Sequence, residues 1–201
     1  MWVLKLGGSL AHADELRAWL AACRDPAIPI AAVVPGGGPF ADAVREAQRM
    51  AGFDDRVAHR MALLAMAQYG WLLHGLEPRL VPASGLAAVR AARGAGQRAL
   101  WLPQADEDCN AVLPQSWDLT SDSLALWLAA EIGAAGVALV KSVAPRGGAR
   151  DAATLAADGY LDACFPDLLR TTGLSACWFA REEAGALQEL AAAPAASRLI
   201  V

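Results

Sequence analysis

Lysine is nearly absent from this sequence. Of the 17 basic residues, two are lysines, Lys5 and Lys141, and the rest are arginines. Lysine has a compact ammonium group and arginine a planar fork, so the two side chains are not interchangeable. A chain that uses arginine almost everywhere and lysine at two positions raises the question of what those two positions do.

Other absences exclude whole classes of function. The formal net charge is -4 and no cluster of lysine and arginine occurs, which argues against a nucleic-acid partner. The four cysteines form no C-x-x-C pair, so neither a zinc site nor a disulfide framework is indicated, and we expect no metal site. No apolar run is long enough to span a bilayer, and no basic region precedes an apolar one at the start of the chain. We therefore expect a cytoplasmic protein without a membrane partner that acts on a small molecule.

The common nucleotide-binding signatures are also missing. The sequence has no G-x-x-x-x-G-K-[ST] loop, and no G-x-G-x-x-G is followed by the usual acidic residue. A flavodoxin-like or Rossmann binder therefore stays a less favoured alternative.

The composition predicts one well-packed domain. Hydrophobic residues make up 56% of the 201 residues and charged residues 19%, with no internal repeat or low-complexity linker. A chain of this length buries a continuous core. We expect residues 1–201 to form a single domain.

Apolar segments alternate with amphipathic helical ones along the chain. This order predicts an α/β fold with a parallel sheet that is covered by helices on both faces. Strands are expected at 2–6, 28–34, 79–83, 98–103, 137–143, 175–180 and 198–201. Helices are expected within 7–24, after 38, at 54–76 (one or two helices), at 120–136 and at 181–193. Segment 90–97 is expected to be a loop, and segment 146–169 a loop-rich region with a short helix.

Two glycine-rich turns each follow a predicted strand and precede a helix. They are Gly7-Gly8-Ser9 and Gly36-Gly37-Gly38. Glycine allows a ligand to approach the backbone closely, and a helix N-terminus offers free N–H groups to an anion. In an open parallel sheet both turns would lie at the carboxyl edge, where ligands bind. The alternative is that glycine serves only to make a tight turn.

Both lysines fall near the ends of predicted strands, at this same edge. Two ammonium groups beside two helix N-termini suit phosphoryl transfer, in which catalysis is mainly positioning and electrostatic stabilisation. Asp122, at the start of a helix, would hold the two ammonium groups in place. The alternatives are solvated strand ends for Lys5 and Lys141, and a helix-dipole role for Asp122.

Three ordered segments resemble signatures of the amino-acid kinase superfamily, which includes acetylglutamate kinase, aspartokinase and UMP kinase. They are "KLGGSL", "VVPGGGPFADAVR" and "TSDSLALWLA". The resemblance implies an αβα sandwich around a mainly parallel sheet, with an acceptor-side lobe at about 1–118 and a nucleotide-side lobe at about 119–201. It implies ATP and Mg²⁺ as cofactors and a carboxylate, carbamate, phosphate or phosphonate as acceptor.

The resemblance also implies roles for residues at the matching positions. Lys5 would contact the transferred phosphoryl group, and Asp122 would organise the lysines. Lys141 departs from the family pattern, in which this strand end has a Thr-Asp pair and the second lysine comes later in the chain; Lys141 would either replace that lysine or bind the ATP phosphates from a shifted position. Nucleotide-binding residues would be Gly7, Gly8, Ser9 and Ser142, and acceptor-binding residues would be Gly36, Gly37, Gly38, Ser121, His59 and Arg60.

Within the superfamily, "SWDLTSDSLALWLA" and "DGYLDACFP" are similar to the compact aminomethylfuran-phosphate kinases of methanofuran-type cofactor biosynthesis. That resemblance implies conversion of a phosphate monoester to a diphosphate. An acceptor phosphate is already ionised, so it needs no general base. Trp117 would pack either on an aromatic acceptor or in the core, and a solvated helix face is the alternative for His59 and Arg60. Two alternative functions stay open: a kinase that acts on a carboxylate or carbamate, and a non-catalytic nucleotide-binding sensor or storage subunit.

The apolar character of residues 54–76 leads us to expect a homodimer or a higher homo-oligomer.

Overall fold

The computed structural model describes residues 1–145, 150–192 and 194–201, and these ranges contain one seven-stranded sheet in the order β3-β4-β2-β1-β5-β6-β7. Every neighbouring pair of strands is parallel except β6 and β7. The predicted fold class, α/β with a mainly parallel sheet, is therefore confirmed. The strands are β1 (Trp2–Leu6), β2 (Ile30–Pro35), β3 (Val81–Ala83), β4 (Ala99–Trp101), β5 (Gly136–Lys141), β6 (Ser175–Ala180) and β7 (Leu199–Ile200).

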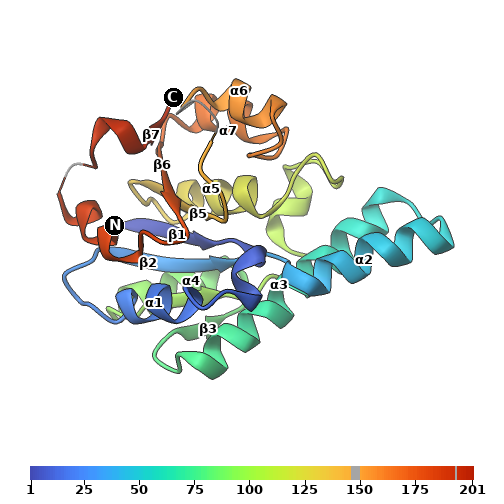
Figure 1. Ribbon diagram of the computed structural model, residues 1–201. Coiled ribbons are helices and arrows are strands. Elements are labelled where there is room, and N and C mark those ends of the chain that lie inside the picture. Colours follow the sequence, from blue (N-terminus) through green and yellow to red (C-terminus); the bar gives the residue numbers. More distant parts are fainter. Residues whose placement is uncertain (146–149, 193) are drawn as a thin grey trace.

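Helices cover both faces of the sheet and give three layers, as Figure 1 shows for α1 on one side and α5, α6 and α7 on the other. Strand residues point alternately to the two faces. Val3 and Leu139 pack in one core cluster with α4, α5, α6 and α7, whereas Leu4 and Val140 pack in the other with η1, α1, η4 and the second half of α3. The helices are α1 (Leu16–Ala22), α2 (Gly38–Ala51), α3 (Asp55–Leu76), α4 (Gly85–Gly94), α5 (Ser121–Glu131), α6 (Ala152–Ala157) and α7 (Phe165–Thr172), with 3-10 segments η1 (Gly8–His12), η2 (Asp108–Ala111), η4 (Ala184–Ala191) and η5 (Ala196–Arg198).

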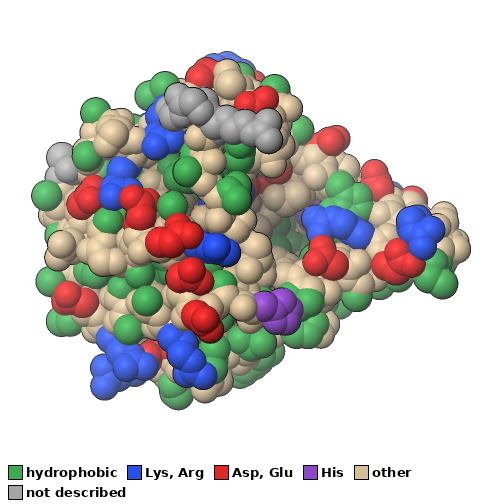
Figure 2. Space-filling model, in the orientation of Figure 1, with side chains coloured by type: hydrophobic (Ala, Val, Ile, Leu, Met, Phe, Trp, Pro, Cys, Tyr) green, Lys and Arg blue, Asp and Glu red, His purple; other side chains and the backbone are tan. Residues whose placement is uncertain are grey.

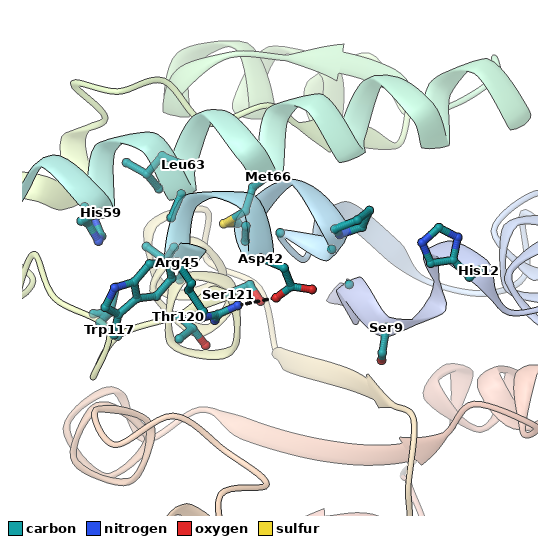
Figure 3. Close-up of a pocket in the computed structure, with 18 residues that line it drawn as sticks. Ser9, His12, Asp42, Arg45, His59, Leu63, Met66, Trp117, Thr120 and Ser121 are labelled. Atoms are coloured by element: carbon teal, nitrogen blue, oxygen red, sulfur yellow. Dashed lines mark hydrogen bonds and ion pairs between the residues drawn. The ribbon is translucent and has the colours of Figure 1, made fainter. Parts of the chain in front are cut away.

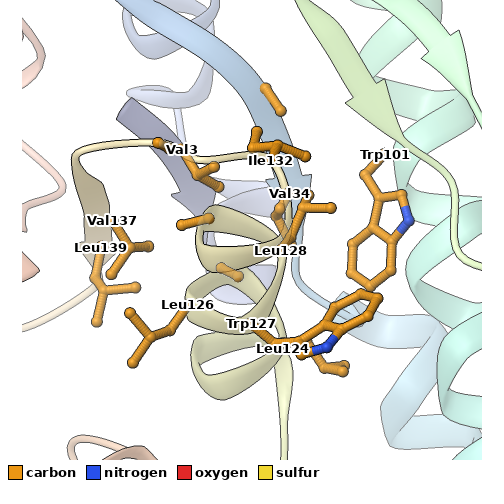
Figure 4. Packing of buried hydrophobic residues seen from close by; sticks show 14 of the residues in the cluster. Val3, Val34, Trp101, Leu124, Leu126, Trp127, Leu128, Ile132, Val137 and Leu139 are labelled. Carbon is orange, nitrogen blue, oxygen red and sulfur yellow. The ribbon is translucent and has the colours of Figure 1, made fainter. Parts of the chain in front are cut away.

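Helix α5 is enclosed on all sides. Every residue from Asp122 to Ala129 is buried. In Figure 4 its Leu124, Leu126 and Leu128 point in different directions into the core, and Trp127 lies against Trp101 with ring centroids 6.0 Å apart. The core therefore holds α5 along residues 122–129 and fixes the buried Asp122 in space, while Ser121 at its N-terminus is only partly buried.

Helix α2 and the first half of α3 extend from the body as an arm, visible in Figure 1. The two helices pack through a small cluster of their own around Ala41, Val44, Ala58 and Ala65. Figure 2 shows that the surface is hollowed between this arm and the body. The arm thus forms one wall of a recess beside the carboxyl edge of the sheet.

Several predicted elements differ from the structure. Segment 90–97 is not a loop throughout, because α4 continues to Gly94: alanine and arginine favour helix, and Leu86, Val89 and Ala92 are buried at a spacing of three. Segment 54–76 holds a single helix, α3. Segment 146–169 contains α6 and the start of α7 rather than one short helix, and its first part, 146–149, lies outside the described residues.

The predicted helix at 181–193 is the 3-10 segment η4. Its buried residues Ala184, Leu187 and Leu190 recur every three positions, which matches the three residues per turn of a 3-10 helix. The turn after β1 likewise enters the short η1 before α1 begins.

Within the described ranges, no helix combines the length and the apolarity that crossing a bilayer requires.

Candidate functional site

Lys5, Asp122 and Lys141 form a largely buried ion-paired triad. Lys5 Nζ lies 2.8 Å from Asp122 Oδ1, and Lys141 Nζ lies 2.6 Å from Asp122 Oδ2. The side chains are 6%, 4% and 17% exposed for Lys5, Asp122 and Lys141. One carboxylate thus holds the ammonium groups of both lysines in the sequence.

The strand register explains why the two lysines meet. β1 and β5 are parallel neighbours in which Lys5 is opposite Leu139. Side chains two residues apart on a strand share a face, so Lys141 lies on the same face as Lys5, one step nearer the carboxyl edge. This is the face that α5 covers. The first turn of α5 then brings Asp122 between the two ammonium groups.

The triad is an electropositive site. Burial by itself raises the pKa of Asp122, but the charges and hydrogen bonds of Lys5 and Lys141 together outweigh burial and lower the pKa to about 2. Burial lowers the pKa of Lys5, and the charge of Asp122 offsets part of that effect. Asp122 is therefore ionised at neutral pH, and with both lysines protonated the triad has a net charge of one positive unit. Such a group attracts and orients an anion.

Asp162 fixes the N-terminus of α5. Its Oδ2 accepts hydrogen bonds from Thr120 N at 3.0 Å, Thr120 Oγ1 at 2.9 Å and Ser123 N at 3.0 Å, and its Oδ1 accepts one from Ser123 Oγ. Thr120 occupies the N-cap position, but its side chain makes no capping bond, and Asp162 performs that function from 42 residues away. Sequence reasoning missed Asp162, because its partners lie in a distant segment.

The two glycine turns pack directly against each other. A Cβ atom at Gly8 would lie 2.2 Å from Gly38 N, and one at Gly36 would lie 2.4 Å from Gly8 N. A Cβ at Gly7 would be 2.9 Å from Val140 O and 3.9 Å from Lys5 Nζ. Glycine is thus required for close backbone approach of the two turns, and Gly7 lies next to the Lys5 ammonium group.

A cavity of about 370 Å³ opens beside these turns. Figure 3 shows Leu63 and Met66 of α3 on one side, with Ser9 and His12 near one end and Trp117 and His59 near the other. Predicted site residues that line the cavity are Gly8, Ser9, Gly37, Gly38, His59 and Ser121.

The remaining predicted residues lie around the cavity or away from it. The triad and the turn residues Gly7 and Gly36 do not line it. Gly7, Gly36 and Asp122 are each next in the chain to a residue that does, and Asp122 connects both lysines to this edge of the cavity. Ser142 follows β5 and is half-buried. Arg60 is exposed on α3 and does not line the cavity.

An arginine and a tryptophan stack at one end of the cavity. The Arg45 guanidinium lies 4.4 Å from the centroid of the Trp117 ring and donates to Asp42 Oδ1 at 2.9 Å. Trp117 Nε1 donates to Gln48 Oε1 at 2.6 Å. Trp117 is therefore a fixed wall of the cavity as well as a packing residue. Sequence reasoning missed Arg45, although it lies seven residues after Gly38 on α2 and so near the same helix face.

His59 is a neutral group in this cavity. Burial lowers the pKa of its imidazole, and Nε2 lies 3.0 Å from Asn110 Oδ1. Because a carboxamide oxygen accepts hydrogen bonds, we assign the ring proton to Nε2, which leaves Nδ1 as an acceptor. His59 therefore contributes no positive charge at neutral pH.

The part of the chain that the structure describes contains no group of three or more histidine, cysteine, aspartate or glutamate side chains that could hold a metal ion. Asp122, the acidic residue nearest the lysines, is already paired with both of them.

The strand order, the layers and the facing glycine turns define an amino-acid kinase fold. Solved structures with this fold include the uridylate kinase of Archaeoglobus fulgidus, at 17% sequence identity and a TM-score of 0.70 over 94% of this chain and 96% of that chain. The UMP kinase of Ureaplasma parvum is also similar, at 15% identity and a TM-score of 0.67 over 89% of this chain and 88% of that chain. So is the UMP kinase of Bacillus anthracis, at 17% identity and a TM-score of 0.67 over 94% of this chain and 90% of that chain.

At these identities the likeness is one of fold, and it sets aside the flavodoxin-like and Rossmann alternatives. No protein-family model matches the sequence, and no curated protein does. The finer resemblance to aminomethylfuran-phosphate kinases stays a prediction.

Proposed function

We propose that this chain is an ATP-dependent kinase that phosphorylates a small molecule held in the 370 Å³ cavity. The observation that supports this most directly is the pairing of both lysines with one carboxylate, beside two glycine turns at the carboxyl edge of the sheet. Phosphoryl transfer develops negative charge on the transferred group, and fixed cations stabilise that charge without reorganisation. The amino-acid kinase fold of the neighbouring structures is consistent with this activity.

The residues of the triad have separate tasks in this proposal. Lys5 contacts the transferred phosphoryl group, and Lys141 contacts the ATP phosphates. Asp122 aims the two ammonium groups. Bound MgATP supplies the phosphoryl group, with Mg²⁺ held mainly through phosphate oxygens and water, as Mg²⁺ prefers.

The glycine turns and the first turn of α5 complete the proposed site. Backbone N–H groups around Gly8 and Ser9 face the ATP phosphates, and those of Gly37 and Gly38 at the start of α2 face the acceptor, whereas the Gly36 N–H donates to Leu6 O. Both settings use helix or turn N–H groups to bind phosphate oxygens. Ser121 and Ser142 add hydroxyl donors on either side.

A phosphate monoester is the acceptor that this cavity suits best. Its oxygen is already ionised, so no general base is needed. Trp117 offers a flat face to a ring, and Arg45 a positive charge. An aminomethylfuran methyl phosphate, which would become the diphosphate, has both a ring and a phosphate. A carboxylate or carbamate acceptor is the alternative.

The proposal is tested by incubating the protein with MgATP and a panel of phosphate monoesters, carboxylates and carbamates, and measuring ADP. Lys5→Met and Lys141→Met should each lower kcat by about 10²- to 10³-fold, because each removes one charge-stabilising donor. Arg56→Met, an exposed substitution outside the cavity, is the matched control and should leave kcat unchanged.

Other outcomes would change the assignment. ATP binding without ADP formation on any acceptor would identify a sensor or storage subunit. Unchanged turnover in Lys141→Met would remove Lys141 from the proposed machinery while leaving Lys5 in place.

A further inference from the structure

A second cavity, of about 290 Å³, lies at the opposite, amino-terminal edge of the sheet. Its lining includes Met1 and Ile30 at the starts of β1 and β2, and Arg98 just before β4. It shares no lining residue with the cavity at the glycine turns. The five residues of β1, at about 3.3 Å each, separate the two edges by roughly 17 Å. The two cavities are therefore distinct.

Three arginines and one carboxylate line this second cavity. Glu77, 2% exposed, accepts a hydrogen bond from Arg24 Nε through Oε2 and one from the backbone N–H of Arg79 through Oε1 at 3.2 Å. Burial by itself raises the pKa of Glu77, but these bonds and the charges of Arg24 and Arg79 together outweigh burial, so the pKa is lowered. With Glu77 ionised, the lining has two more positive than negative charges, on a chain whose net charge is -4.

Two of the three guanidinium groups lack an acidic partner. Arg98 Nη2 donates to the carbonyl oxygens of Asp25 and, at 2.7 Å, Ile28, which anchors the group but does not neutralise it. Arg79 is exposed, and among the residues that the structure describes its side chain makes no hydrogen bond. Across residues 1–145, 150–192 and 194–201, no carboxylate pairs with Arg79 or Arg98. Glu77 thus offsets only part of the positive charge of the lining.

We propose that this cavity binds a phosphate dianion, either inorganic phosphate or the phosphoryl end of a small organic phosphate. Guanidinium forks match phosphate oxygens in geometry, and a dianion matches the excess of two positive charges. Glu77 holds Arg24 in place, and the two carbonyl oxygens hold Arg98, so these two side chains lose little conformational freedom on binding. The inference goes beyond the proposed kinase function and does not depend on it.

Calorimetric titration with inorganic phosphate, and separately with phenyl phosphate, at constant ionic strength tests this site. Arg79→Ala should weaken binding at least about tenfold. Its side chain is exposed and its bond to Glu77 comes from the backbone, so the variant should fold. Arg17→Ala, exposed on α1 and outside the cavity, is the matched control and should bind as the parent does.

Lys141→Met separates this site from the triad. Binding that survives Lys141→Met and is lost in Arg79→Ala supports the proposal, as does a two-phase titration from which Arg79→Ala removes one phase. Binding that is lost in Lys141→Met and unchanged in Arg79→Ala would overturn it, and so would the absence of heat with both probes. Tighter binding of phenyl phosphate would point to an organic phosphate, and equal binding to the inorganic ion.

Discussion

Lys5 has 6% of its side chain exposed, and a buried ammonium group is tolerated in a fold only where it is paired. Asp122 pairs with it and with Lys141 at once, so the three charges form one unit. A change to any one of them should alter the other two. This coupling makes the pH dependence of the protein informative.

If the proposed kinase needs the charged form of Lys5, activity should fall at high pH earlier than an ordinary lysine would allow. Burial lowers the pKa of Lys5 from 10.5, and the protonated form exists below that lowered pKa. A plot of kcat/KM against pH should therefore show an alkaline limb below pH 10.5. In Lys5→Arg, which stays charged, any residual activity should lack this limb. An alkaline limb that is identical in both proteins would assign the titration to another group.

Gly36 provides a test of close backbone approach. A methyl group at Gly36 would meet Gly8 N at 2.4 Å, whereas one at Gly75 would meet nothing within 4 Å. Gly36→Ala should lower the free energy of unfolding by about 1–3 kcal/mol, because the two turns must separate. Gly75→Ala, the matched control, lies in the last turn of α3 and should be neutral or slightly stabilising. Urea denaturation of the two variants measures both effects, and equal stabilities would contradict this account.

For single residues, the sequence predicted which side chains belong to the site better than it predicted their hydrogen-bond partners. Lys5, Lys141 and Asp122 stand out because lysine is rare and strand ends are recognisable. The bonds from Trp117 to Gln48 and from Thr120 to Asp162 join segments 69 and 42 residues apart. No local periodicity encodes such pairs, since they depend on how the whole chain folds.

At the scale of elements, the position of Asp122 depends on the start of α5, which Asp162 holds. Asp162 accepts four hydrogen bonds there, whereas an asparagine has a single acceptor oxygen. Asp162→Asn should therefore lower the free energy of unfolding by about 1–3 kcal/mol. It should also lower kcat, if the proposed function is correct, because α5 no longer fixes Asp122.

Asp158→Asn is the control for this prediction. Asp158 is an exposed residue at the end of α6, four positions from Asp162, and its substitution should change stability by less than about 0.5 kcal/mol. Thermal unfolding and ADP release are measured for both variants. If Asp162→Asn matched Asp158→Asn in both, the capping role would be refuted.

The elements themselves were largely predictable. Strands β1, β5 and β6 are mostly buried apolar runs, so their composition identifies them. The strand order was not predicted: β5 lies beside β1 although β2, β3 and β4 come between them in the chain. The errors fell where a glycine or an alanine-rich segment left the local signal ambiguous. Helix α4 (Gly85–Gly94) was not predicted, because the segment "RAARGAGQ" was interpreted as a loop.

At the scale of the molecule, α3 has an exposed apolar stripe. Val57, Leu64 and Trp71 are 45%, 44% and 56% exposed and recur every seven residues, so they lie along one side of the helix. We propose that this stripe packs against the same stripe of a second copy, which would produce the expected homodimer. Contiguous apolar surface of this kind is typical of protein interfaces.

Leu64→Glu tests the interface. It should convert the oligomer to a monomer in light scattering coupled to gel filtration, because a buried unpaired charge is costly at an apolar contact. Met50→Glu, at a position 74% exposed at the end of α2, is the control and should leave the assembly intact. A parent protein with the 20.9 kDa mass of one chain would exclude the dimer.

The near absence of lysine has a consequence for chemical labelling. Acylating reagents and aldehydes modify the many exposed ε-amines of most proteins, but here the two ε-amines are 6% and 17% exposed and lie side by side. Apart from the amino terminus, the sequence offers such reagents no other primary amine. An amine-directed electrophile would therefore meet no competing lysine on the surface. The extent of modification at Lys141, the more accessible of the two lysines, would report whether a ligand covers the triad.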